Sequence, residues 1–326
     1  MSGPNSQHPN LTKMTKAFTD ELAAQNAPPL YTLTPEAARQ VLIEAQSGPV
    51  DEPEVQTRDL DLPVGPQGHT SVRLVGRDLG APAPLMLYLH GGGWVMGNKA
   101  THDRLVRRLA YETGVTAAFV DYVPSPDSQY PQPLEQAYAV LEYLVKNAGQ
   151  FHLEAGRAIV VGDSVGGNMA LALALMAKER QGPEIGLEVL FYPVTDAGFD
   201  TDSYQAFSEG PWLTLRAMKW FWDAYLPDKD RRREITASPL QAKPEELKGL
   251  PPILILTAEN DVLRDEGEAM ARKLDEAGVK ASSVRFNGTI HDFVMLNALA
   301  ETGPAKKALR LAVSVINEYI GSRKKA

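Results

Sequence analysis

The stretch that decides the fold is residues 158–167, Ala-Ile-Val-Val-Gly-Asp-Ser-Val-Gly-Gly. Four apolar residues typical of a buried strand run into Gly-Asp-Ser-Val-Gly, and a helical pattern follows at about 165–180. This order predicts a nucleophile elbow, a strand-to-helix turn that strains the serine and requires small residues two positions either side of it. Gly162 and Gly166 meet that requirement, so we expect the Ser164 hydroxyl to stand above the sheet at a helix N-terminus.

Other interpretations of these glycines fit less well. A phosphate-binding loop needs Lys-Ser or Lys-Thr after its last glycine, and a dinucleotide fingerprint needs G-x-G-x-x-G. Neither pattern is present in residues 158–167. The remaining alternative is a glycine-rich turn that only packs a helix on a strand.

Outward from the elbow, short apolar or alternating runs are separated by helical patterns. Because strands that alternate with helices form right-handed crossovers, we expect an α/β fold with a mostly parallel sheet covered by helices on both faces. The runs expected as strands are Val55–Leu62, Thr70–Val75, Leu85–Leu89, Thr116–Val120, Ala158–Val161, Leu187–Phe191, Ile253–Leu256 and Ala281–Phe286. The expected helices between and after them lie near 101–113, 133–147, 165–180, 262–277 and 301–320.

Composition narrows the class of protein. The 326 residues carry a net charge of −8, which argues against nucleic acid as the main partner because phosphate binding needs clustered Lys and Arg. The absence of cysteine removes disulfides, cysteine-ligated metals and a thiol nucleophile. Residues 1–10 lack the apolar core of a signal peptide, and no run approaches the roughly 18 apolar residues that span a bilayer. We therefore expect a soluble, cytoplasmic protein with no membrane association.

A serine nucleophile needs a general base and an acid that orients it. In α/β-hydrolases both follow the serine, and His291 is the one histidine C-terminal to Ser164. Two aspartates lie between them at strand ends, Asp196 and Asp261. We favour Asp261, because it belongs to the last strand-to-helix loop before His291.

Residues 90–94, His-Gly-Gly-Gly-Trp, follow the strand expected at 85–89. Glycines allow backbone N–H groups to converge on one point, as the oxyanion of an acyl-transfer intermediate requires. Together with the N–H of Val165 they would form a three-donor oxyanion hole. The plainer alternative is a flexible turn.

These motifs resemble the hormone-sensitive lipase family, the bacterial family IV carboxylesterases. The resemblance runs from about residue 50 to the C-terminus and rests on residues 90–94, 162–167, 261–266 and 288–293. It implies an α/β-hydrolase fold with a helical cap, with Ser164 as nucleophile, Asp261 as acid and His291 as base. It assigns the oxyanion N–H groups to Gly91, Gly92 and Val165.

The sequence departs from the family pattern in two places. Val165 stands where the family usually has a small residue, which would add bulk near the acyl site. Residues 123–126, Val-Pro-Ser-Pro, replace the usual Arg-Leu-Ala-Pro after the Asp121-Tyr122 pair.

Residues 197–250 carry no strand signal, and Phe199 to Tyr225 hold eight of the 24 aromatic residues. We interpret them as a cap over the carboxyl ends of the strands, where open α/β sheets bind ligands; a helix that only docks through its aromatics is the alternative. With the cap helices that the family places at the N-terminus, the predicted division is 1–50 for N-terminal cap helices, 51–196 with 251–326 for the catalytic domain, and 197–250 for an inserted cap.

The predicted function is a serine carboxylesterase that hydrolyses short-chain acyl esters through an acyl-enzyme, without cofactor or metal. We expect Trp94, Tyr122 and Trp212 to contact the small-molecule ester. The same triad would also serve an amidase, a thioesterase or a lactonase, and a non-catalytic ligand receptor is a further alternative. The strand near Ala281–Phe286 could join two copies into a homodimer, as in members of the family.

Overall fold

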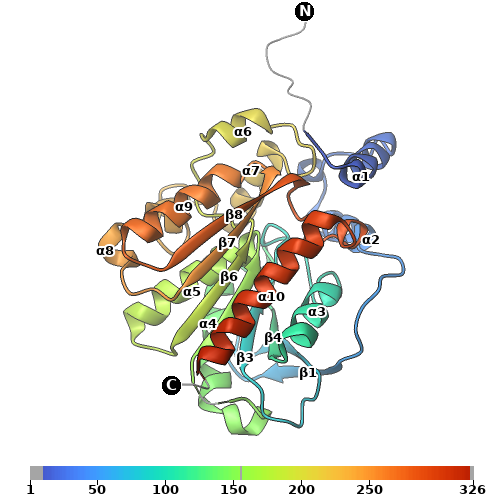
Figure 1. The fold of residues 1–326 in the computed structure, drawn as a ribbon. Coiled ribbons are helices and arrows are strands. Elements are labelled where there is room, and N and C mark those ends of the chain that lie inside the picture. The colour runs from blue at the N-terminus through green and yellow to red at the C-terminus, as the bar shows by residue number, and fades with distance from the viewer. Residues whose placement is uncertain (1–9, 155, 324–326) are drawn as a thin grey trace, which may run out of the picture.

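The computed structural model describes residues 10–154 and 156–323. Within them an eight-stranded sheet has the order β1-β2-β4-β3-β5-β6-β7-β8 (Figure 1). β1 and β2 pair antiparallel, as do β2 and β4, and every other pairing is parallel, so the predicted mostly parallel sheet is confirmed. The strands are β1 (Gln56–Leu62), β2 (Thr70–Gly76), β3 (Leu85–Leu89), β4 (Thr116–Asp121), β5 (Ala158–Asp163), β6 (Ile185–Phe191), β7 (Ile253–Asn260) and β8 (Ala281–Ile290).

Helices cover both faces of this sheet. α3 and α10 contact each other on one face and α4 contacts α5 on the other, which confirms the predicted layers (Figure 1). The helices are α1 (Lys13–Ala24), α2 (Pro35–Ala45), α3 (Asp103–Thr113), α4 (Gln132–Lys146), α5 (Val165–Arg180), α6 (Asp202–Ala206), α7 (Leu215–Tyr225), α8 (Pro244–Leu247), α9 (Arg264–Glu276) and α10 (Gly303–Arg323).

Two strands run well beyond their predicted ends: β7 continues past Leu256 to Asn260, and β8 continues past Phe286. β8 ends at Ile290, which pairs with Asn260 of β7 after an irregularity in the register. Gly288, at a positive φ of 73°, lies at this irregular end. The extension matters because it carries the chain directly to His291.

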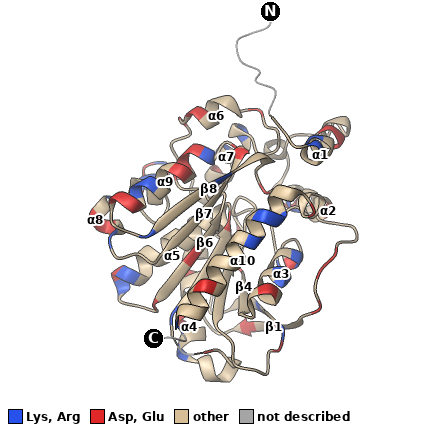
Figure 2. Ribbon diagram, in the orientation of Figure 1, with Lys and Arg blue, Asp and Glu red and all other residues tan. Residues whose placement is uncertain are grey.

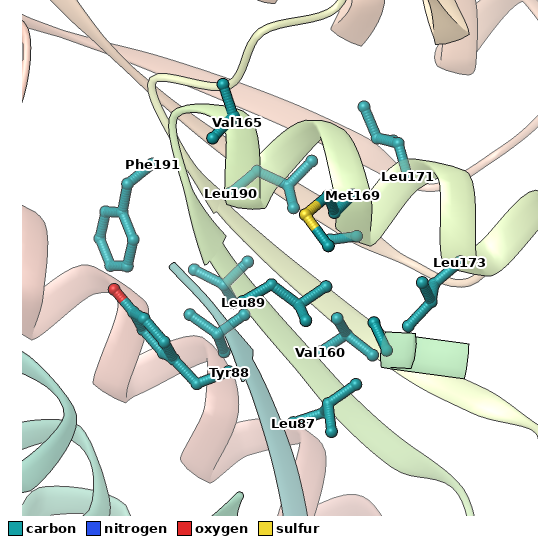
Figure 3. Packing of buried hydrophobic residues seen from close by; sticks show 14 of the residues in the cluster. Leu87, Tyr88, Leu89, Val160, Val165, Met169, Leu171, Leu173, Leu190 and Phe191 are labelled. Atoms are coloured by element: carbon teal, nitrogen blue, oxygen red, sulfur yellow. The ribbon is translucent and has the colours of Figure 1, made fainter. Parts of the chain in front are cut away.

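α5 is the central helix of the fold. Every residue from Val165 to Ala177 is buried, so this part of the helix is surrounded by protein on all sides. Figure 3 shows Met169 among Leu89, Val160 and Leu190 of the strands beneath it. Truncating one such Leu side chain to Ala typically lowers the free energy of unfolding by about 2–5 kcal/mol. The packing of these side chains therefore stabilises the position of α5.

The segment between Asp196 and Leu250 contains, in its described residues, helices and 3-10 turns without a strand. The N-terminal segment lies near it, because the turn Leu30–Thr32 contacts α7 and α1 contacts β8. Both segments lie at the end of the sheet where β7 and β8 finish (Figure 1). The division into body and cap stays a prediction, and residues 1–9 of the predicted cap lie outside the described residues.

Charged side chains lie mainly on helices and loops, and the central strands are almost free of them (Figure 2). Among helices of the described ranges, none has both the length and the apolar character needed to cross a membrane.

Glu188 is a charged residue type that lies in the middle of a central strand, β6. The residue is fully buried, and neither carboxylate oxygen has a hydrogen-bond partner within the described residues. Burial raises the pKa of Glu188 from its ordinary 4.5 to about 8. The folded protein therefore holds this carboxyl protonated at pH values where the unfolded chain has lost the proton.

We predict that the wild type loses stability as the pH rises, because Glu188 must then ionise inside the protein. Glu188→Gln should abolish this loss. The raised pKa of Glu188 in the folded state contributes to the free energy of unfolding. This contribution is complete below pH 4.5 and is lost as the pH rises towards about 8. Urea denaturation at several pH values should show the variant gaining stability relative to wild type across this window. Parallel pH profiles for the two proteins would contradict this account of Glu188.

Candidate active site

The turn between β5 and α5 has the geometry of a nucleophile elbow. Ser164 has φ +54° and ψ −120°, a strained conformation for a residue with a side chain. A Cβ on Gly162 would lie 2.3 Å from the carbonyl oxygen of Gly166, and a Cβ on Gly166 would lie 1.9 Å from that of Leu89. The two glycines are therefore required by close backbone contact, as the sequence predicts.

The structure brings Ser164, His291 and Asp261 together from three separate loops. His291 Nε2 lies 2.9 Å from Ser164 Oγ, and His291 Nδ1 lies 2.7 Å from Asp261 Oδ2. All three residues are at most 4% exposed. A neutral imidazole that donates its Nδ1–H to Asp261 leaves Nε2 free to accept the serine proton.

The charges around His291 stabilise its protonated form. Burial lowers the pKa of His291, but the negative charges of Asp261 and Asp292 outweigh that effect and raise it to about 9. An imidazolium formed by proton transfer from Ser164 is thus stabilised where it forms. The neutral base is most abundant at alkaline pH.

Asp196, the other candidate acid, lies elsewhere. Its Oδ1 accepts a hydrogen bond from Gln241 Nε2 at 2.8 Å, and the residue lines a separate polar cavity of about 690 Å³. Neither Ser164 nor His291 lines that cavity. The structure thus pairs Asp261, and not Asp196, with the histidine.

The glycine loop after β3 differs from the prediction by one residue. The prediction was wrong for Gly91, because its N–H already donates to Asp163 Oδ1 at 3.0 Å. Gly92 and Gly93 instead line the cavity beside Ser164, at φ +104° and +64°. In the described part of the chain, the N–H groups of Gly92, Gly93 and Val165 have no acceptor.

Asp163, to which the sequence analysis assigned no role, holds this loop in place through its hydrogen bond with Gly91. Its Oδ1 also accepts the Tyr88 hydroxyl at 2.8 Å, and its Oδ2 lies 3.2 Å from His102 Nε2. Burial raises the pKa of Asp163, but His102 and the hydrogen bonds outweigh it and lower the pKa overall. A buried carboxylate of this kind persists only when it is paired, so it holds Gly91 in one position. Its position directly before Ser164 in the sequence could have indicated that Asp163 belongs to the site.

Of the three residues expected to contact substrate, the structure places only Trp212 in the cavity wall. Trp94 is fully buried and stacks on Tyr225 with ring centroids 4.1 Å apart. Tyr122 is buried and donates its hydroxyl to the carbonyl oxygen of His90 at 3.0 Å. Neither Trp94 nor Tyr122 lines the cavity, and both are engaged in these contacts inside the protein.

The cavity at Ser164 has a volume of about 510 Å³ and a largely apolar wall. Val165 is fully buried and is not among the residues that form this wall. The wall comes from α1, α2, the glycine loop and the segment before and within α7. Its larger apolar side chains include Leu22, Leu30, Val41, Leu42, Met96, Trp212, Leu213, Met218 and Phe221.

Two buried side chains hold the loop after His291, and no local pattern in the sequence indicates either of them. Gln46 Nε2 at the end of α2 donates to the carbonyl oxygens of Thr101 at 2.6 Å and Met295 at 3.0 Å. Arg104 of α3 donates through Nη2 to the carbonyl oxygens of Val294 at 2.6 Å and Met295 at 2.8 Å. The N-terminal segment is thereby tied to the loop that carries the histidine.

The described residues include no group of three or more His, Asp or Glu side chains placed to hold a metal ion. The groups that the structure brings together at Ser164 are a hydroxyl, an imidazole, a carboxylate and backbone N–H groups.

A family model described as alpha/beta hydrolase fold matches residues 86–295. The chain belongs to the α/β-hydrolase family. The resemblance to hormone-sensitive lipase relatives is confirmed, and this α/β-hydrolase is a hydrolytic enzyme.

Named relatives cover nearly the whole chain. This α/β-hydrolase is 33% identical to an ethyl acetate hydrolase of Pseudomonas putida, over 97% of this chain and 100% of that protein. It is 36% identical to the carboxylic ester hydrolase LipN of Mycobacterium tuberculosis, over 85% of this chain and 76% of the relative. A crystal structure of a thermostable esterase from Pseudomonas putida ECU1011 matches with a TM-score of 0.93 and 43% identity, over 96% of this chain and 99% of that one.

Proposed function

We propose that this α/β-hydrolase is a serine carboxylesterase that hydrolyses short-chain acyl esters. The observation that carries the proposal is the continuous contact from Ser164 Oγ through His291 to Asp261 at the base of an apolar cavity. The relatives named ethyl acetate hydrolase and carboxylic ester hydrolase support the choice of ester over amide or thioester substrates.

In the acylation step, Ser164 Oγ attacks the ester carbonyl while His291 Nε2 takes the hydroxyl proton. The negative charge that develops on the carbonyl oxygen is stabilised by the free N–H groups of Gly92, Gly93 and Val165. Removing one donor of such a hole typically costs about 10²–10³-fold in kcat. The imidazolium then gives its proton to the leaving alcohol.

In the deacylation step, water replaces the alcohol and loses a proton to His291 as it attacks the acyl-enzyme. The carboxylic acid leaves and Ser164 regains its hydroxyl. Asp261 keeps its negative charge throughout, holding the imidazole tautomer and stabilising the imidazolium.

The side chains around Ser164 support the proposed preference for short acyl chains. Side chains of α1, α2 and α7 close over Ser164, and we assign these segments the role of cap. Phe221 lies so near Gly93 that a Cβ there would be 2.1 Å from the ring. The space next to the glycine loop is therefore narrow.

Hydrolysis of p-nitrophenyl esters with acyl chains of two to twelve carbons tests this function, using wild type, Ser164→Ala, Asp261→Asn and Asp196→Asn at alkaline pH. Wild type should turn over the short esters best. Ser164→Ala should fall to the background rate, and Asp261→Asn should lose about 10³–10⁴-fold in kcat because the imidazole loses its partner.

Asp196→Asn is the matched control, since Asp196 contacts Gln241 outside the cavity, and its kcat should equal that of wild type. No serine-dependent turnover of any ester would overturn the proposed function. A loss at Asp196 in place of Asp261 would overturn the assignment of the acid, and faster turnover of medium or long chains would overturn the short-chain preference.

We also propose that two copies associate through β8. This strand is the last in the sheet, and Val284 on it is 36% exposed, a large apolar side chain beside unpaired backbone groups. Light scattering should give twice the monomer mass, and Val284→Lys should give the monomer mass. A monomeric wild type at micromolar concentration would contradict the dimer. The cytoplasmic location stays a prediction.

A further inference from the structure

Asp292 places a carboxylate in the cavity that the proposed mechanism does not use. Apart from His291, it is the one residue with an ionisable side chain among the described residues that line this cavity. Its side chain is only 13% exposed. A charge in such a setting acts on a ligand more strongly than it would in water.

Two contacts hold this carboxylate in place. Oδ2 accepts a hydrogen bond from Trp212 Nε1 at 2.9 Å, and Oδ1 lies 3.4 Å from His291 Nε2 without a hydrogen-bond partner among the described residues. Burial and the nearby charges of Asp163 and Asp261 raise the pKa of Asp292 overall. His291 and the Trp212 N–H oppose that rise by stabilising the ionised form. The free oxygen is therefore beside the nitrogen that carries out proton transfer.

The position of that nitrogen fixes which part of an ester meets the carboxylate. The leaving alcohol receives its proton from His291 Nε2, so its oxygen must come within hydrogen-bond distance of that atom. Asp292 Oδ1 is already within 3.4 Å of the same atom. The alcohol portion of the substrate is consequently the part that lies near the negative charge.

We propose that Asp292 is a specificity-determining residue that selects the charge of the alcohol portion. Esters of neutral or cationic alcohols are accepted, and esters of anionic alcohols are rejected. This inference rests on the proposed esterase function and adds a substrate class to it. A unit charge about 6 Å from the carboxylate, at an effective dielectric constant near 20, corresponds to a discrimination of about ten- to a hundredfold.

Three acetate esters with alcohols of different charge test the proposal. They are acetylcholine, its neutral isostere 3,3-dimethylbutyl acetate, and the anionic 2-sulfoethyl acetate. We expect Asp292→Asn to raise the anionic-to-neutral ratio of kcat/KM by about ten- to a hundredfold and to lower the cationic-to-neutral ratio. The ratios cancel any common effect of the substitution on His291.

Asp196→Asn again serves as the matched control, because it removes a carboxylate that lies outside this cavity, and its ratios should equal those of wild type. Ratios for Asp292→Asn within twofold of wild type would overturn the proposal. A ratio change of equal size in Asp196→Asn would overturn it too, since the effect would then come from overall charge.

Should Asp292→Asn lose all turnover, the dissociation constants of the three esters in Ser164→Ala, with and without Asp292→Asn, give the same contrast. Loss of the charge preference on adding Asp292→Asn supports the proposal, and an unchanged preference overturns it. Failure of wild type to hydrolyse the neutral ester would count against the esterase function itself, and the binding measurement would still decide the role of Asp292.

Discussion

The close approach of β3, β5 and the start of α5 is the constraint on which the rest of the site depends. The backbone of Gly166 contacts that of Leu89, and Gly162 contacts Gly166, so neither position has room for a Cβ. The chain must therefore turn from strand to helix within Ser164, which takes the strain of a positive φ. The apolar packing around α5 stabilises the turn from behind, and the serine is held in one position before any substrate binds.

The polar side chains of the site gather at the carboxyl ends of neighbouring parallel strands. β3 leads to the glycine loop, β5 to Ser164, β7 to the loop with Asp261, and β8 directly to His291. Because β3 and β5 are adjacent, Asp163 can bind Gly91 across the gap and leave the next glycines free. Buried carboxylates recur here, and each of Asp163, Asp261 and Asp292 is stabilised by a histidine or a hydrogen-bond donor.

The sequence predicted the fold and the three contacting residues because these depend on local patterns. An apolar run before a glycine-flanked serine permits few structures. The general base must follow the serine in the chain, and a single histidine does so, which limited the choice to His291. The prediction of Gly91 as an oxyanion donor was wrong, since its N–H donates to Asp163 and the next two glycines have a positive φ. No local pattern in residues 90–94 carries that information.

Long-range contacts account for the remaining omissions. Gln46 reaches Met295, 249 positions away in the chain, so nothing near Gln46 in the sequence indicates its partner. Trp94 directly follows the three glycines, and this position led to the prediction that it contacts the substrate. Its ring is instead stacked on Tyr225 from α7. Aromatic residues next to a site can serve packing as readily as binding, and only the tertiary structure separates the two.

The central claim is that Ser164 is the nucleophile, activated by His291. The most direct measurement is reaction with diethyl p-nitrophenyl phosphate, with the modified residue located by tandem mass spectrometry. The account predicts one diethylphosphoryl group per chain, on Ser164, with loss of esterase activity in proportion to labelling and greatly slowed labelling in His291→Ala. Modification of another residue, or full activity after Ser164 is labelled, would contradict it.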